Sequence, residues 1–217
     1  MLKKENADTK ELILDAARSE FAAKGYYATS MDSIVKATGL SKGAIYWHFG
    51  SKFELFRAVL DRQVRNTKSI IFPSETDLEE QGLKEFFRKR GEQLIDYLFS
   101  ERENTLLWLH INLEAQRGKT DIADLARGML DSLVEDLMRR ILDLEPDYGK
   151  NEVNLKELIL LFRAILNGVM LDFQLRQTPD LAKKFWKFLI HVLIPDVGQE
   201  NKTAGCTTCP TVRRQLN

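Results

Sequence analysis

Apolar residues recur at three- and four-residue intervals along most of the chain, which is the period of an amphipathic α-helix. In the first such segment Ile13, Ala16, Ala17 and Phe21 fall on one face. No segment shows the alternation of apolar and polar residues that a half-buried strand needs. The pattern predicts an all-α fold with helices over 8–24, 31–38, 42–49, 51–71, 83–99, 103–117, 121–144, 151–177 and 181–194. The polar, acidic segment 73–82 is expected to be a loop.

The second and third predicted helices are joined by a very short turn. Thr29 is a candidate N-cap for 31–38, with Asp32 at the capping-box position, and Gly39 ends that helix. Ser41 is a good N-cap for the helix that follows. Two helices joined by a short turn that contains Gly form the helix-turn-helix pattern. The spacing alone is equally compatible with an ordinary corner between two helices.

The third predicted helix is suited to a close approach to another surface. Its first turn adds little bulk beyond one cation, because it consists of Lys42, Gly43 and Ala44. It ends in aromatic side chains that can hydrogen-bond, namely Tyr46, Trp47 and His48. A short helix with donors at its N-terminus is typical of a recognition helix in a DNA groove.

These residues resemble the N-terminal domain of the TetR (tetracycline repressor) family over roughly the first sixty residues. The matching positions are Ile13, Phe21, Gly25, 29–31, Ile34, Ala37, 39–49, Lys52, Leu55 and Phe56. The segment 43–49 is most similar to family members that repress multidrug-efflux genes. The rest of the chain has a helical layout that is compatible with the family.

The resemblance implies roles for individual residues in DNA binding. Phosphate contacts are expected from Thr29, Ser30, Tyr46, His48 and Lys52. The recognition helix, capped by Ser41, is expected to place Lys42, Gly43 and Ala44 nearest the base edges, with Trp47 against backbone or base. Phosphate contacts fix the register of a protein on DNA, whereas base contacts select the sequence.

The charge distribution agrees with this assignment. The whole chain has 32 Lys and Arg and 32 Asp and Glu, so its formal net charge is zero. Residues 1–68 carry twelve basic and eight acidic residues, a net charge of +4, and the remainder carries −4. A basic module beside an acidic body is suited to contact with phosphates.

The last two predicted helices are apolar around most of their circumference, which indicates burial on more than one side. They suggest an interface between subunits, and the resemblance implies the same, because family members dimerise through a four-helix bundle about a twofold axis. The residues expected in this interface are Phe162, Ile165, Val169, Phe185, Phe188, Leu189 and Val192.

The central helices carry residues of mixed character that could line a mostly apolar pocket with a few polar groups. The candidates are Trp108, His110, Asn112, Arg163, Asn167, Met170 and Gln174. Core packing and hydrogen bonds between helices are the alternative role for all of them. The discriminating feature is a cavity, because a regulator controlled by a partner protein needs none.

Other classes of protein find little support. No carboxylate pair, metal-ligand cluster, nucleophile motif or phosphate-binding glycine loop occurs, so neither an enzyme, a cofactor nor a metal is expected. Cys206 and Cys209 form an isolated Cys-x-x-Cys in a polar tail, which is weak evidence for a metal or redox site. The N-terminus has no signal peptide, and 155–173 is interrupted by charges, so a cytoplasmic protein is expected.

The sequence therefore predicts a helix-turn-helix DNA-binding domain over 8–68, a helical ligand-binding and dimerisation domain over 69–197, and a disordered tail over 198–217. The expected function is a homodimeric transcriptional repressor that leaves a palindromic operator when an apolar or amphipathic small molecule binds. An efflux system is a candidate target. The alternative is a DNA-binding regulator that responds to a partner protein.

Overall fold

The computed structural model describes residues 2–72, 75–118, 120–146, 155–176 and 178–194, and every regular element within these ranges is a helix. The helices are α1 (Leu2–Ala28), α2 (Met31–Thr38), α3 (Lys42–His48), α4 (Lys52–Ile71), α5 (Glu75–Ser100), α6 (Arg102–Gln116), α7 (Asp121–Leu144), α8 (Leu155–Arg176) and α9 (Pro179–Leu193). The predicted all-α fold is confirmed. The predicted tail lies outside the described residues.

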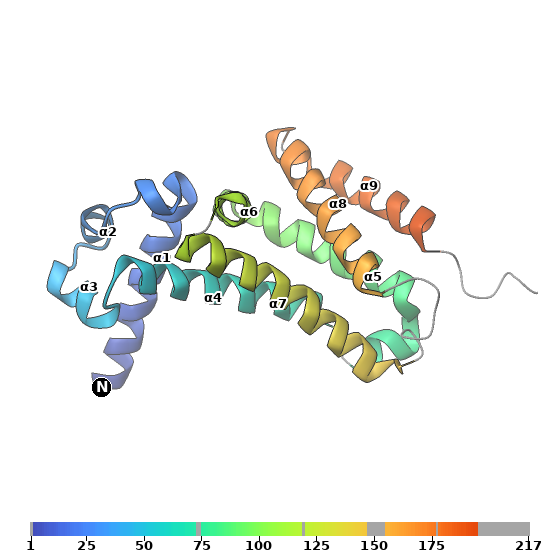
Figure 1. Ribbon diagram of the computed structural model, residues 1–217, viewed down its shortest axis with the longest axis horizontal. Coiled ribbons are helices and arrows are strands. Elements are labelled where there is room, and N and C mark those ends of the chain that lie inside the picture. The colour runs from blue at the N-terminus through green and yellow to red at the C-terminus, as the bar shows by residue number, and fades with distance from the viewer. Residues whose placement is uncertain (1, 73–74, 119, 147–154, 177, 195–217) are drawn as a thin grey trace, which may run out of the picture.

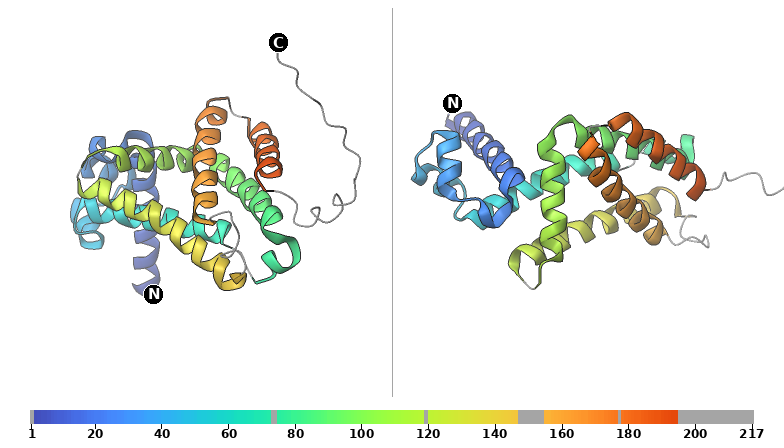
Figure 2. Two further views of the ribbon diagram at one scale, coloured as in Figure 1. Left: turned by 45° about the vertical axis from the view of Figure 1, so that its right-hand side comes forward. Right: turned by 90° about the horizontal axis from the view of Figure 1, so that it is seen from above.

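Helices α1 to α3 form a small unit at one end of the molecule, and α4 runs from that unit along the body (Figure 1). In the body α8 and α9 lie side by side, and α5 lies next to α9 (Figure 2). Among the described helices none is both long and apolar enough to cross a membrane.

The predicted loop over 73–82 is wrong in its second part, because α5 begins at Glu75. This segment is rich in Glu and Gln, which are good helix formers, and polarity alone does not distinguish an exposed helix from a loop. The helical path is interrupted only at Gly82, where φ is 68°. The sequence therefore carried one signal for an interruption of this helix, the glycine at position 82.

Two of the three caps that the sequence predicted for the helix-turn-helix unit, Ser41 and Gly39, are confirmed. Ser41 accepts a hydrogen bond from the Ala44 N–H, and Ser51 accepts one from the Glu54 N–H. Gly39 ends α2 in the left-handed conformation, as expected of a C-terminal glycine.

The predicted N-cap Thr29 is wrong, because Ser30 caps α2 by accepting from the Ser33 N–H at 3.0 Å. The Thr29 hydroxyl donates instead to the carbonyl oxygen of Gly25 at 2.8 Å, within the bend that interrupts α1. Gly25 has a φ of 74°, which a side chain would disfavour. Thr29 therefore holds this bend closed.

A compact apolar core holds α1 to α3 against the start of α4. Its members are fully or almost fully buried, and the largest are Ile13, Phe21, Ile34, Ile45, Leu55 and Phe56. The rings of Phe21 and Phe56 meet edge to face with centroids 4.8 Å apart. Burial of two such rings supplies several kilocalories per mole, so the short helix α3 depends on this core more than on its own hydrogen bonds.

Helix α9 is attached to α5 by one tryptophan. Trp186 is 1% exposed, and its indole N–H is shared between the carbonyl oxygens of Phe87 and Arg88, both at 3.1 Å. The indole packs directly on Gly91, where a Cβ atom would lie 2.1 Å from the ring. The close approach of the two helices therefore requires glycine at this position.

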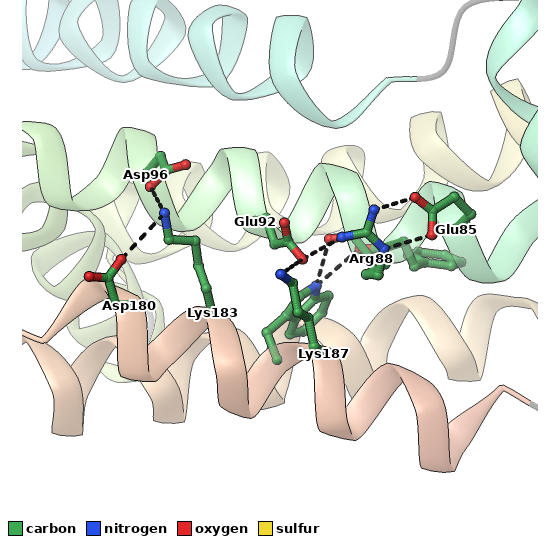
Figure 3. Close-up of polar contacts among 9 residues, drawn as sticks. Glu85, Arg88, Glu92, Asp96, Asp180, Lys183 and Lys187 are labelled. Atoms are coloured by element: carbon green, nitrogen blue, oxygen red, sulfur yellow. Dashed lines mark hydrogen bonds and ion pairs between the residues drawn. The ribbon is translucent and has the colours of Figure 1, made fainter.

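Charged side chains flank this contact (Figure 3). Arg88 pairs with Glu85 and Glu92, Lys187 approaches Glu92 at 3.6 Å, and Lys183 pairs with Asp96 at 2.7 Å. Solvent-exposed pairs of this kind contribute about 0–1 kcal/mol each. Burying the ~150–250 Å² of a tryptophan contributes about 4–6 kcal/mol, so the indole dominates the attachment.

We expect Gly91→Ala to lower the free energy of unfolding by about 1–3 kcal/mol, because the new methyl group forces the indole from its site. The measurement is urea denaturation at fixed protein concentration. Gly128→Ala is the matched control, since Gly128 lies within α7 with nothing within 4 Å of the added Cβ atom. The control should be neutral or stabilising by up to about 1 kcal/mol. Equal effects of the two substitutions would contradict this account of the helix contact.

Candidate DNA-binding surface and effector cavity

Helix α3 exposes the residues that the sequence assigned to DNA. Ile45 is completely buried and anchors the helix, while Lys42, Gly43 and Tyr46 face solvent. Trp47 is 72% exposed, an unusual state for so large an apolar side chain. Its ring meets that of the half-buried His48 edge to face at 4.7 Å. Ser30, Ser41 and the half-buried Ala44 complete this surface.

Lys42 already has an acidic partner. Its ammonium nitrogen lies 2.8 Å from a carboxylate oxygen of Asp32 on α2. Hydrogen bonding to this carboxylate raises the pKa of Lys42 above its ordinary value. Because both side chains are exposed, the pair is weak and can exchange for a stronger acceptor on DNA.

Two of the predicted phosphate contacts need correction. The Thr29 side chain is 2% exposed and its hydroxyl donates inward, so a phosphate cannot reach this hydroxyl in the described conformation. The Lys52 ammonium donates to the carbonyl oxygens of Tyr26 and Thr29 at 2.9 and 2.8 Å, and lies 4.4 Å from the centre of the Tyr26 ring. Burial lowers the pKa of Lys52 below its ordinary value. Lys52 therefore holds the loop before α2 and keeps one N–H for another acceptor.

The small unit of α1 to α3, called the DNA-binding unit below, docks on the body mainly where α1 crosses α6. The Arg18 guanidinium lies 2.7 Å from Glu101, 3.0 Å from Glu103 and 2.9 Å from the side-chain oxygen of Asn104. The Ser19 hydroxyl donates to Glu103 at 2.8 Å. One arginine at the crossing thus engages two side chains of α6 and that of its N-cap residue, Glu101.

His110 belongs to this docking contact and does not line the cavity, so its predicted ligand role is wrong. A Cβ atom on Gly25 would lie 3.0 Å from the His110 Nδ1 atom. The imidazole therefore rests on the glycine bend of α1. The sequence showed His110 in apolar surroundings but could not show that α1 supplies them.

A cavity with a volume of about 120 Å³ lies in the body between α4, α5, α6, α7, α8 and α9. Its wall is mainly aliphatic and aromatic. Four predicted residues line it, namely Trp108, Arg163, Asn167 and Met170. Asn112 does not line the cavity itself, but its side-chain oxygen accepts a hydrogen bond from the lining residue Asn167 at 3.3 Å. The side chain of Gln174 lies outside the described residues.

The sequence analysis missed the part of the cavity wall that α4 and α5 contribute. The polar members of that part are Thr67 and Arg90. A signal for Thr67 was present, because it follows the buried residues Phe56, Leu60 and Gln63 on one face of α4. A polar residue at the end of a buried series merits attention as a possible ligand contact. Arg90 carries no comparable signal.

The predicted dimer interface is only partly exposed. Phe162 and Val169 are each 3% exposed within one protomer, and Phe162 lies against the Phe87 ring, so assigning these two to the interface is wrong. Ile165 and Leu189 are half-buried. On α9, Phe185, Phe188 and Val192 are 43%, 61% and 59% exposed.

Three further leucines of α8 and α9 that the sequence analysis did not select are also exposed. They are Leu161 and Leu171 on α8 and Leu181 on α9. Helix α8 has apolar residues on most of its circumference, so periodicity could not decide which side faces its own protomer.

Within the described residues, no group of three or more His, Cys, Asp or Glu could hold a metal ion. Cys206 and Cys209 lie outside them.

Comparison with known proteins places the N-terminal unit in a family. Residues 13–59 match the family model described as bacterial regulatory proteins, tetR family. The chain is 41% identical over 56 residues to the HTH-type transcriptional regulator SrpR of Pseudomonas putida, and 47% identical over 57 residues to the HTH-type transcriptional activator FasR of Mycolicibacterium smegmatis. Each alignment covers 26% of both chains, so the chain matches about a quarter of the length of these curated relatives.

Solved structures extend the likeness to the fold of the body. Salmonella enterica GusR superimposes with a TM-score of 0.68 at 22% identity, covering 86% of this chain and 95% of that chain. A Clostridium perfringens protein described as a putative fatty acid metabolism regulator gives a TM-score of 0.67 at 20% identity, covering 85% and 98%. Residues 13–59 are thus similar to the N-terminal domain of the TetR family of transcriptional regulators, and the body shares the fold of these solved structures.

Proposed function

We propose that this chain is a homodimeric transcriptional repressor that binds operator DNA through α3 and leaves it when a small molecule occupies the body. The observation that carries the proposal is the double role of α6. Its Trp108 lines the cavity, while its Asn104 and His110 contact α1. A change of cavity shape that moves α6 also moves the DNA-binding unit.

The cavity favours control by a small molecule over control by a partner protein alone. A protein interior is close-packed, so an apolar cavity of about 120 Å³ forfeits packing energy unless something fills it. Binding of a ligand there would recover that energy. The proposed domains are 8–68 for DNA binding and 69–197 for ligand binding and dimerisation.

The exposed face of α8 and α9 supports a homodimer. A twofold interface uses the same patch on both subunits, and a patch of six large apolar residues needs a partner in water. A dimer presents two α3 helices to two half-sites, whose separation must match about 34–36 Å or a multiple. A ligand that favours another separation weakens operator binding without touching DNA.

The regulated genes are proposed from the recognition helix alone. Because residues 43–49 resemble those of multidrug-efflux repressors, an efflux operon is the first candidate. Selection of genomic fragments by the purified protein, followed by sequencing, tests the whole proposal. Enrichment of a palindromic sequence would support it, and retention of random fragments would overturn it.

Lys42→Ala should lose discrimination at one or two operator positions by about 1–3 kcal/mol if Lys42 reads guanine. Lys52→Ala should weaken all sequences alike, and it should also lower the melting temperature because it removes the donor to two carbonyl groups. Fluorescence anisotropy against a set of single-base operator variants separates the two effects. Relaxed specificity in Lys52→Ala with an unaltered Lys42→Ala would reverse our assignment.

Phe188→Asp should dissociate the dimer, because a buried unpaired carboxylate costs several kilocalories per mole. Operator affinity should fall with it. Sedimentation velocity at micromolar concentration measures the oligomeric state. The control is Leu113→Asp on α6, where the leucine is 50% exposed outside the proposed interface, and this variant should remain dimeric. A monomeric wild-type protein would refute the interface.

Asn167→Trp should fill the cavity, abolish the response to effector and leave operator affinity within a few-fold. A thermal-shift screen of hydrophobic drugs, fatty acids and bile-like amphiphiles followed by operator titration provides the measurement. Linkage requires operator DNA to weaken effector binding by the same factor by which the effector weakens operator binding. The corresponding coupling free energy is typically about 1–3 kcal/mol. Asn66→Trp, at an exposed position of α4, is the control and should respond normally. An unchanged response of Asn167→Trp would place the effector elsewhere.

A further inference from the structure

Several buried side-chain atoms lack a hydrogen-bond partner among the residues that the structure describes, and two of them, on uncharged residues, belong to the cavity wall. They are the Thr67 hydroxyl oxygen on α4 and the Trp108 indole nitrogen on α6. The side chains are only 3% and 7% exposed, so water does not readily solvate them. Nearly all buried polar groups in folded proteins are hydrogen-bonded, and an exception calls for an explanation. These two exceptions line the same cavity, which points to a polar group brought by a ligand.

The charges around the cavity indicate the sign of that group. Two arginines line it, Arg90 from α5 and Arg163 from α8, and none of the lining residues that the structure describes is Asp or Glu. The Arg163 guanidinium lies 4.0 Å from a carboxylate oxygen of Asp131, whose side chain is 70% exposed and does not line the cavity. A cation entering this cavity would meet two like charges, whereas an anion would meet two opposite ones.

The donors agree with the charges. An indole nitrogen can only donate a hydrogen bond, and a hydroxyl can donate as well as accept. Guanidinium groups only donate. A group that accepts several hydrogen bonds and carries a negative charge can pair with the indole, the hydroxyl and the guanidinium groups at once. A carboxylate has this character.

The volume limits the apolar part of the ligand. An apolar cavity of about 150 Å³ is known to hold benzene. The cavity here measures about 120 Å³ and has a predominantly apolar wall. An alkyl chain of medium length or a single aromatic ring is therefore the appropriate size, with modest adjustment of the surrounding side chains.

We propose that the effector is a small carboxylate with an apolar body, whose oxygens accept hydrogen bonds from Thr67 and Trp108 in the field of Arg90 and Arg163. The proposal rests on the proposed function in one respect, namely that this cavity is the effector site. The carboxylate proposal adds to the proposed function the sign of the effector's charge and the residues that recognise that charge. Cationic amphiphiles are excluded as effectors by the same argument.

Three probes with the same eight-carbon chain test the charge: octanoate, octanol and octylammonium. Isothermal titration calorimetry with the full chain in the absence of DNA should show octanoate binding at least tenfold more tightly than octanol, with octylammonium weakest. Arg163→Gln should weaken octanoate severalfold and leave octanol unchanged. Equal or tighter binding of octanol or octylammonium, or no binding of octanoate, would overturn the proposal.

Two threonines provide a matched pair of variants. Thr67→Val removes the unpartnered hydroxyl at nearly constant volume, so it should raise the melting temperature by about 2–4 °C and weaken octanoate about tenfold. Thr105 is equally buried, but its hydroxyl donates to the Leu98 carbonyl at 2.6 Å. Thr105→Val should therefore lower the melting temperature and leave octanoate affinity unchanged. A lower melting temperature for Thr67→Val together with unchanged octanoate affinity would remove Thr67 from the site.

Operator binding, measured first without and then with these probes, distinguishes the two levels of the proposal. If the protein binds an operator and octylammonium releases it, the carboxylate assignment is wrong and the regulator remains. If the protein selects no operator, the proposed function fails whichever probe binds.

Discussion

The contact between α1 and α6 is the constraint on which the rest of the structure depends. Arg18 ties α1 to Glu101, Glu103 and Asn104, and the bend at Gly25 receives the imidazole of His110. The ion pairs are partly exposed and individually weak, so the steric fit at Gly25 is the more demanding part. A packed contact of this kind has few alternative arrangements, because interiors resist continuous deformation. The orientation of the DNA-binding unit is therefore tied to the position of α6.

Helix α4 provides the second connection between the two parts. It starts in the core of the DNA-binding unit, where Phe56 is buried, and continues into the body, where Lys68 pairs with Asp136 of α7 at 2.6 Å. Near its middle, Gln63 accepts a hydrogen bond from the Tyr97 hydroxyl of α5 at 3.2 Å. Two separate connections, one through α4 and one through α6, define an orientation that one alone would leave free to rotate.

The sequence was sufficient for most of the helices because their ends depend on local signals. Caps at Ser41 and Ser51 and the left-handed glycine at Gly39 are short-range features. The errors arose where a long-range contact decides between two local options. Thr29 and Ser30 are both good caps, and only the Gly25 bend determines which one faces inward. Likewise Phe162 and Leu161 are neighbours on α8, and the positions of Phe87 and Trp186 decide that Phe162 is buried.

The same dependence on long-range packing explains why the cavity wall was only half predicted, and it suggests how the cavity communicates with DNA. The unpartnered Thr67 hydroxyl and Trp108 indole nitrogen lie on α4 and on α6, the two helices that reach the DNA-binding unit. A ligand group that accepted from both would tie these helices together at a distance set by its own size. Such a bridge acts on both connections at once, whereas an apolar ligand that only fills space acts on neither in a defined direction. The cost of leaving two buried donors unpartnered in the free protein is then part of the free energy that ligand binding releases, and only differential interactions of this kind can shift a conformational equilibrium.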